Sequence, residues 1–263
     1  MRYLNLFALQ MRTSLLLAAQ YRWDFMIDGA ISMFRVLTAV VPLFVVYGSE
    51  GKGGIPGWSI GEALVVTGWF ILMQGILEGA INPGLEAVID HIRKGTLDFV
   101  LLKPADAQFL VSTSRFQPWK IISVFNALAV FAVAFHQMGR LPTLSGIAVA
   151  LALLISATAM MYSLWILIVS SAFFVVKVDN LTYLFSSIFD AARWPVTVFK
   201  GVLLFFFTLI LPLAVMTTYP AEALLGRLDF STLSTVLLQS VLFAAVARFV
   251  WKQSLSHYSS AGG

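Results

Sequence analysis

The chain has 263 residues, of which 59% are hydrophobic and 11% are charged, with a formal net charge of +4 and no cysteine. A soluble domain has about 25% charged residues, so this composition excludes a soluble globular protein and predicts an all-α integral membrane protein. The lack of cysteine excludes disulfides and sites built from thiolates. The basic excess is explained by loops that face anionic lipid, so we expect no nucleic-acid partner. We expect one transmembrane domain over residues 1–263.

Residues 1–22 predict an amphipathic helix that lies in the membrane interface. Apolar residues recur there at helical spacing. They are Leu4, Phe7, Met11, Leu15 and Ala18. Gln10 and Arg12 interrupt the apolar run, which argues against a cleaved signal peptide.

Six later segments are long and apolar enough to cross about 30 Å of hydrocarbon. The expected spans are residues 25–47, 62–81, 119–138, 144–176, 196–216 and 232–251. An even number of spans places both ends of the chain on one side. Basic residues predict that this side is the cytoplasm, because thirteen of sixteen in the positions compared fall in segments on that side. The three on the other side are Lys52, Arg140 and Arg227.

The polar loop 82–118 separates the second and third spans. Asn82-Pro83-Gly84 is expected to break the second span, and a short amphipathic helix should follow. Its apolar stripe consists of Leu85, Val88, Ile89 and Ile92, and its polar residues are Glu86, Asp90, Arg93 and Lys94. Gly95 is placed to end this helix as a C-cap. The pattern fits equally a docking element for a soluble partner and a helix that lies on lipid.

The loop 177–200 carries a second apolar stripe. Its members are Leu181, Leu184, Phe185, Ile188 and Phe189. A helix on the lipid surface is the favoured interpretation here, with a second partner contact as the alternative.

Three charged residues fall inside the first two spans: Asp28, Arg35 and Glu78. Arg35 lies about 13 Å into its span, where an unpaired charge is costly. We expect Arg35 to contact Glu78 or Asp28. The pair would serve either as a substrate or gating charge, or as a structural ion pair, with inward snorkelling of Arg35 as a further alternative. Gly75 and Gly79 give the second span a small-residue face for close helix packing.

Two stretches carry a family resemblance, HIRKGTLDFVLLKP (residues 91–104) and LPLAVMTTYPAEALLGRLD (residues 211–229). Together with the order of parts, they resemble the permease subunit of bacterial type-two ATP-binding-cassette (ABC) exporters. The resemblance implies six transmembrane helices, an N-terminal interfacial helix, a cytoplasmic coupling helix between spans 2 and 3, and a short re-entrant outer helix at 217–229. It assigns ATPase coupling to residues of the first inner loop, namely Glu86, Ile89, Asp90, Ile92, Arg93, Lys94 and Gly95. It assigns an outer gate to Tyr219, Pro220 and Glu222.

The resemblance also implies the partners. These are two cytoplasmic ATPase subunits, a second permease that is the same chain or a related one, and the lipid of the bacterial inner membrane. ATP and Mg²⁺ would be bound by the partners, because Gly51-Lys52-Gly53-Gly54 lacks the spacing of a phosphate loop. Neither His136 nor His257 has a metal-ligand partner at suitable spacing, so no metal, cofactor or catalytic site is expected in this chain. A secondary transporter or channel that works without an ATPase is the alternative function.

Overall fold

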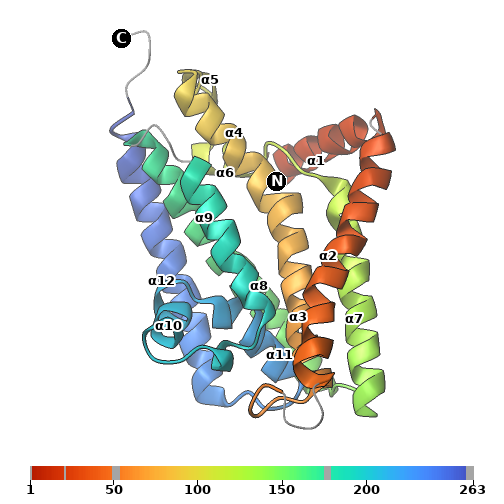
Figure 1. The fold of residues 1–263 in the computed structure, drawn as a ribbon. Helices are drawn as coiled ribbons and strands as arrows, with labels where there is room; N and C mark the ends of the chain where they lie inside the picture. Colours follow the sequence, from red (N-terminus) through yellow and green to blue (C-terminus); the bar gives the residue numbers. More distant parts are fainter. Residues whose placement is uncertain (1, 21, 49–53, 175–178, 259–263) are drawn as a thin grey trace.

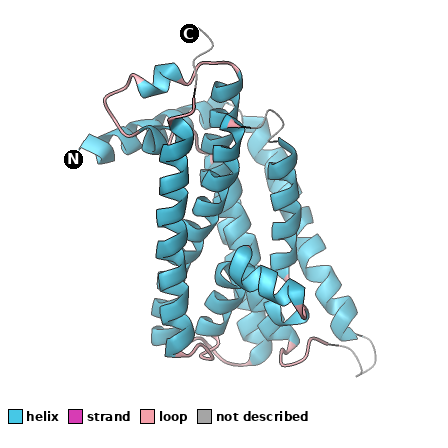
Figure 2. Ribbon diagram, turned by 90° about the vertical axis from the view of Figure 1, so that its left-hand side faces the viewer, coloured by secondary structure: helices cyan, strands magenta, loops and turns pink. Residues whose placement is uncertain are grey.

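The structure is a computed structural model that describes every residue except 1, 21, 49–53, 175–178 and 259–263. The described residues form helices and no strands (Figures 1 and 2). The α-helices are α1 (Arg2–Gln20), α2 (Arg22–Gly48), α3 (Ile60–Ile76), α4 (Asn82–Arg93), α5 (Asp98–Leu101), α6 (Ala107–Ser112), α7 (Ile122–Met138), α8 (Leu144–Ser170), α9 (Asp179–Phe189), α10 (Val202–Phe205), α11 (Tyr219–Leu224) and α12 (Phe230–Leu255). Shorter 3₁₀ and π turns are η1 (Leu77–Ile81), η2 (Pro118–Ile121), η3 (Ser171–Phe173), η4 (Asp190–Arg193), η5 (Val196–Val198), η6 (Phe206–Ile210) and η7 (Ala214–Thr218).

Helix α1 lies across one end of a bundle of long helices, at the top of Figure 1, where α12 also ends. We call this the α1 end, and the other the opposite end. Both ends of the described chain therefore lie at the same end of the bundle, as an even number of crossings requires. The Tyr3 ring packs edge-on against Phe109 at 4.9 Å, and Phe7 against Phe116 at 5.6 Å. One side of α1 thus contacts the chain's own loop around α6.

Five described helices are long and apolar enough to span a membrane. They are Met26–Gly48, Ile60–Arg93, Pro118–Met138, Leu144–Phe173 and Phe230–Leu255. These match the expected first, second, third, fourth and sixth spans, so the multi-pass prediction is confirmed for them.

The expected fifth span, 196–216, is not one straight helix. Two helical pieces, Val202–Ile210 and Ala214–Leu224, meet at an angle of 68° around Pro212. Proline lacks the N–H that a continuing helix needs, which explains a break at this position.

Helix α9 was expected in a loop on the membrane surface, and this prediction is wrong. Phe185 and Phe189 are buried, and Phe189 packs 5.4 Å from Phe70 in the middle of α3. The indole of Trp58, at the opposite end, donates to Thr197 Oγ1 at 3.0 Å. Residues 179–197 therefore pass through the bundle from the α1 end towards the opposite end. Of the apolar stripe of α9, Phe185 and Phe189 pack in the core, Ile188 is half-buried and Leu184 is exposed. The side chain of Leu181 lies outside the described residues.

Glycines on one face of α3 allow α7 to approach closely. A Cβ atom on Gly68 would lie 2.5 Å from the Phe131 ring, and one on Gly75 would lie 2.5 Å from Ser123 Cβ. Gly61 and Gly79 make similar approaches to α7 and η2. The predicted small-residue face at Gly75 and Gly79 is confirmed, and it extends along the whole helix.

Helix α3 continues into α4 through the π turn η1. The predicted break at Asn82-Pro83-Gly84 is therefore wrong. Pro83 sits in the first turn of α4, where its missing N–H costs little. Residues Ile60–Arg93 form a helix of 34 residues. At 1.5 Å per residue this is about 51 Å, well beyond the roughly 30 Å of hydrocarbon. We call α4 and α5 together the arm, because they project at the α1 end (Figure 1).

Candidate functional site

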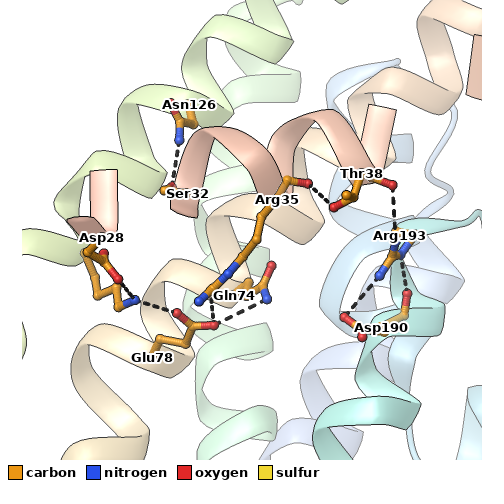
Figure 3. Close-up of polar contacts among 10 residues, drawn as sticks. Asp28, Ser32, Arg35, Thr38, Gln74, Glu78, Asn126, Asp190 and Arg193 are labelled. Carbon is orange, nitrogen blue, oxygen red and sulfur yellow. Dashed lines mark hydrogen bonds and ion pairs between the residues drawn. The ribbon is translucent and has the colours of Figure 1, made fainter. Parts of the chain in front are cut away.

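Four charged side chains from three spans meet near the α1 end. Arg35 forms an ion pair with Glu78, one of the two partners expected from the sequence. Lys120 Nζ lies 2.5 Å from Asp28 Oδ1 and 2.8 Å from Glu78 Oε2. The cluster therefore holds two cations and two carboxylates, and we call it the ion network (Figure 3). Sequence reasoning did not place Lys120 in this cluster, because Lys120 is the second residue of the expected span 119–138 and has no charged neighbour in the chain.

The π turn η1 places Glu78 in this network. Glu78 is 18 residues beyond Ile60, or about 27 Å along the helix, so the network lies near the membrane boundary rather than at its centre. The side chain of Arg35 extends from α2 to meet Glu78 (Figure 3). Gln74 Nε2 also donates to Glu78 Oε1 at 3.3 Å.

The ion network ties three helices together at the root of the arm. Lys120 is 10% exposed and Asp28 16% exposed, so their charges are largely removed from solvent. A buried charge that loses its partner is strongly destabilising, so the helices that carry these groups are held in register. Any tilt of α4 relative to α2 and α7 must shift or break these contacts.

The apolar stripe of α4 faces the chain itself. Leu85, Val88 and Ile89 are buried, and α4 packs against α6 and α8. A Cβ atom on Gly84 would lie only 2.7 Å from the Val111 carbonyl oxygen. In this structure the stripe therefore neither inserts into a partner's groove nor lies in lipid, and both predictions are wrong. Ile89 is not available to a partner.

The remaining arm residues lie on the surface or close the helix. Glu86, Asp90, Arg93 and Lys94 are exposed. Gly95 has φ +63°, and the amide of Thr96 donates to the His91 carbonyl at 2.9 Å. These features form a Schellman C-cap, so the predicted helix end at Gly95 is confirmed.

The tip of the arm exposes apolar side chains that the sequence analysis had not singled out. Phe99 is 69% exposed and Leu102 is 81% exposed, and both follow the exposed Arg93 and Lys94 closely in the chain. Leu97 beneath them is fully buried. An exposed apolar patch rimmed by charge is typical of a protein interaction site. The signal was present in the sequence as the run TLDFVLL.

A second charged surface lies between α2 and η4, beside the middle of α3. Arg193 pairs with Asp190 at 3.2 Å, donates to the Thr38 carbonyl at 3.4 Å, and lies 5.4 Å from the centre of the Phe70 ring (Figure 3). Asp190 is 52% exposed. Arg193 belongs to the segment 177–200, which was expected to be a loop, and its position beside Phe70 corrects that expectation.

At the opposite end, Glu62 joins three loops. Its carboxylate is 8% exposed and pairs with Arg140 at 3.0 Å and with Arg227. It also completes a capping box with Ser59 at the start of α3. The Ser59-x-x-Glu62 spacing is a signal that the sequence analysis overlooked.

The expected outer-gate residues lie on α11, beside this cluster. Pro220 is buried in the first turn of α11, and Tyr219 and Glu222 are half-buried. Gly226 has φ +71°, and the Arg227 amide donates to the Glu222 carbonyl at 2.8 Å, so Gly226 closes α11 as a C-cap. The structure does not bring Tyr219 or Glu222 to the ion network. Within the described residues no group of three or more metal-ligating side chains occurs.

A comparison with family models identifies the family to which the chain belongs. Residues 33–262 match the model of the ABC-2 family transporter protein. The chain belongs to the ABC-2 transporter family. The match covers the ion network apart from Asp28, the whole arm, and α11. Comparisons with curated proteins and with solved structures gave no match. An ABC-2 permease is a membrane component of a transporter and implies association with ATPase subunits.

Proposed function

We propose that this ABC-2 permease forms half of an export pathway in the bacterial inner membrane, driven by two cytoplasmic ATPase subunits that bind ATP and Mg²⁺. A second permease, the same chain or a related one, completes the pathway. The α1 end then faces the cytoplasm, with both chain termini. The single observation that carries the proposal is the 34-residue helix, because its excess length lifts the arm out of the membrane at that end.

The arm is the coupling element in this proposal. Its apolar stripe is used internally, so the contact with the ATPase falls to the exposed tip, with Phe99 and Leu102 at the centre and Arg93 and Lys94 at the rim. A buried apolar centre with a charged rim is the usual anatomy of a protein interface.

The ion network transmits the movement of the arm. ATP-driven closure of the ATPase pair pushes on the tip, and the arm acts on α2 and α7 through Glu78 and Lys120. Packed helices linked by ion pairs move as rigid bodies rather than deforming continuously. This assigns the network to force transmission and positioning.

The charged surface of Asp190 and Arg193 borders the translocation pathway. Ionisable residues exposed at membrane depth face water or another protein subunit, since facing lipid is costly. At the outer side, residues 202–224 form a re-entrant element, and Tyr219, Pro220 and Glu222 close the exit. The crossing by residues 179–197 supports this, because it brings the chain to the outer side before α10 begins.

The test is co-purification of the ATPase subunit co-expressed with this chain. Phe99→Ser with Leu102→Ser, and separately Arg93→Glu with Lys94→Glu, are expected to reduce the ATPase recovered while the permease still inserts. Lys252→Glu, an exposed charge reversal at the same end of the bundle, is the matched control and is expected to have no effect. Unchanged recovery in both tip variants would contradict the proposal, as would solute movement by the chain alone in liposomes.

A further inference from the structure

A groove lies between α7 and α8 in the half of the bundle near the opposite end. Its volume is about 680 Å³, within the range of roughly 300–1,000 Å³ typical of ligand pockets. The buried side chains of Trp69 and Phe135 contribute to its floor, and Leu128 and Leu151, each 56% exposed, lie on its open side. The groove therefore opens sideways, towards the membrane.

The groove has the length of one leaflet. Its lining on α7 runs from Leu128 to Gly139, a rise of about 16 Å. Half of a hydrocarbon core of roughly 30 Å is about 15 Å. An acyl chain that enters at the loop between α7 and α8 thus reaches the bilayer midplane at the far end of the groove.

The mouth of the groove carries positive charge. Arg140 lines it and is half-exposed, and it shares the carboxylate of Glu62 with Arg227. Among the described residues that line the groove, Arg140 is the only arginine, lysine, aspartate or glutamate. An apolar groove one leaflet deep with a guanidinium at headgroup level is complementary to a lipid that has a phosphate above its acyl chains.

We propose that this groove is a binding site for an anionic phospholipid of the leaflet at the opposite end, with one acyl chain along α7 and α8 and the phosphate at Arg140. The bound lipid fills the space that α7 and α8 leave open and links α3, α7, α8 and α11. The site is separate from the ion network and from the arm, so it does not depend on the proposed coupling to an ATPase.

Photolabelling tests the proposal. The probe is phosphatidylglycerol with a diazirine on one acyl chain, mixed into phosphatidylcholine vesicles that contain the full-length protein. Labelled peptides are expected to concentrate on residues 128–154. Ala132→Trp, at an exposed alanine on the groove wall, is expected to abolish that labelling, whereas Ala152→Trp, at an exposed alanine outside the lining, is expected to preserve it.

The headgroup is tested separately. Arg140→Gln is expected to weaken competition by unlabelled phosphatidylglycerol about fivefold, the preference that one basic residue gives at an anionic surface, and Arg140→Lys is expected to retain it. Equal labelling of α2 and α12, labelling unaffected by Ala132→Trp, or equal competition by uncharged diacylglycerol would each overturn the proposal.

Discussion

The Nζ atom of Lys120 lies 2.8 Å from Oε2 of Glu78, where the start of the third span meets the π turn at the root of the arm. Glu78 also pairs with Arg35, and Lys120 with Asp28, so this contact joins two ion pairs into one network. A force on the arm therefore reaches α2 and α7 through ion pairs whose separation strongly destabilises the fold.

Lys120→Met is expected to destabilise the protein by about 3 kcal/mol, because it leaves two partly buried carboxylates with one cation. The free energy of unfolding in detergent measures this. Adding Asp28→Asn restores the balance of charge and is expected to recover part of the loss. Lys252→Met is the control at an exposed lysine. An equal effect of Lys120→Met and Lys252→Met would show that the network does not hold the helices together.

Gly75→Ala is expected to lower the free energy of unfolding by about 1–3 kcal/mol, because its Cβ atom would lie 2.5 Å from Ser123 Cβ and force α3 from α7. Ser123→Gly in the same chain removes that clash and is expected to restore stability in thermal unfolding. Gly48→Ala has open space around it and serves as the control. Failure of Ser123→Gly to rescue would contradict the close packing.

Acid is expected to remove the contribution of Asp106 to stability. Its side-chain hydrogen bond with Arg248 holds the pKa of Asp106 below its ordinary value. Because the folded-state pKa is the lower one, the pair stabilises the fold above the ordinary pKa of about 3.9 and loses this effect as pH falls through the folded-state pKa.

Asp106→Asn is the matched variant for that test, since asparagine can still cap α6 as Asp106 does. The difference in unfolding midpoint between the wild type and Asp106→Asn is expected to shrink as the pH is lowered to about 3. A difference that is constant with pH would contradict the assignment.

Glu62→Gln is expected to destabilise the loops at the opposite end by about 1 kcal/mol, since it removes the charge shared by Arg140 and Arg227 while glutamine keeps the capping box. Glu62→Ala loses the cap as well and is expected to cost about 1 kcal/mol more. Thermal unfolding compares the two. Identical midpoints for the glutamine and alanine variants would show that the cap contributes nothing.

Composition and apolar length were sufficient to predict the membrane class and five spans, because crossing lipid imposes a length that few other structures share. A carboxylate partner for Arg35, either Glu78 or Asp28, was also predictable, since an intramembrane charge requires a partner. Lys120 could not be assigned to it from sequence, because only the close packing at Gly75 and Gly79 brings η2 beside Glu78.

The remaining differences come from tertiary packing. Asn82-Pro83-Gly84 has the composition of a helix break, yet the π turn before it and the close approach of Gly84 to α6 favour a continuous helix. The amphipathic stripe of α9 resembles that of a surface helix. The burial of Phe189 and Phe185 follows from contacts with Phe70 and Trp165 that no local pattern reveals. The break at Pro212 shows that the apolar run 196–216 has the length of a span without its geometry.

Cross-linking from the tip of the arm tests the account most directly. The chain contains no cysteine, so Leu102→Cys provides a single reactive thiol at the proposed ATPase contact. Gln137→Cys, at an exposed position at the opposite end of the bundle, is the control. With a short thiol cross-linker in membranes, we expect a covalent product with the ATPase subunit from position 102 and none from position 137. A product from position 137, or none from position 102 in a complex that still transports, would contradict the account.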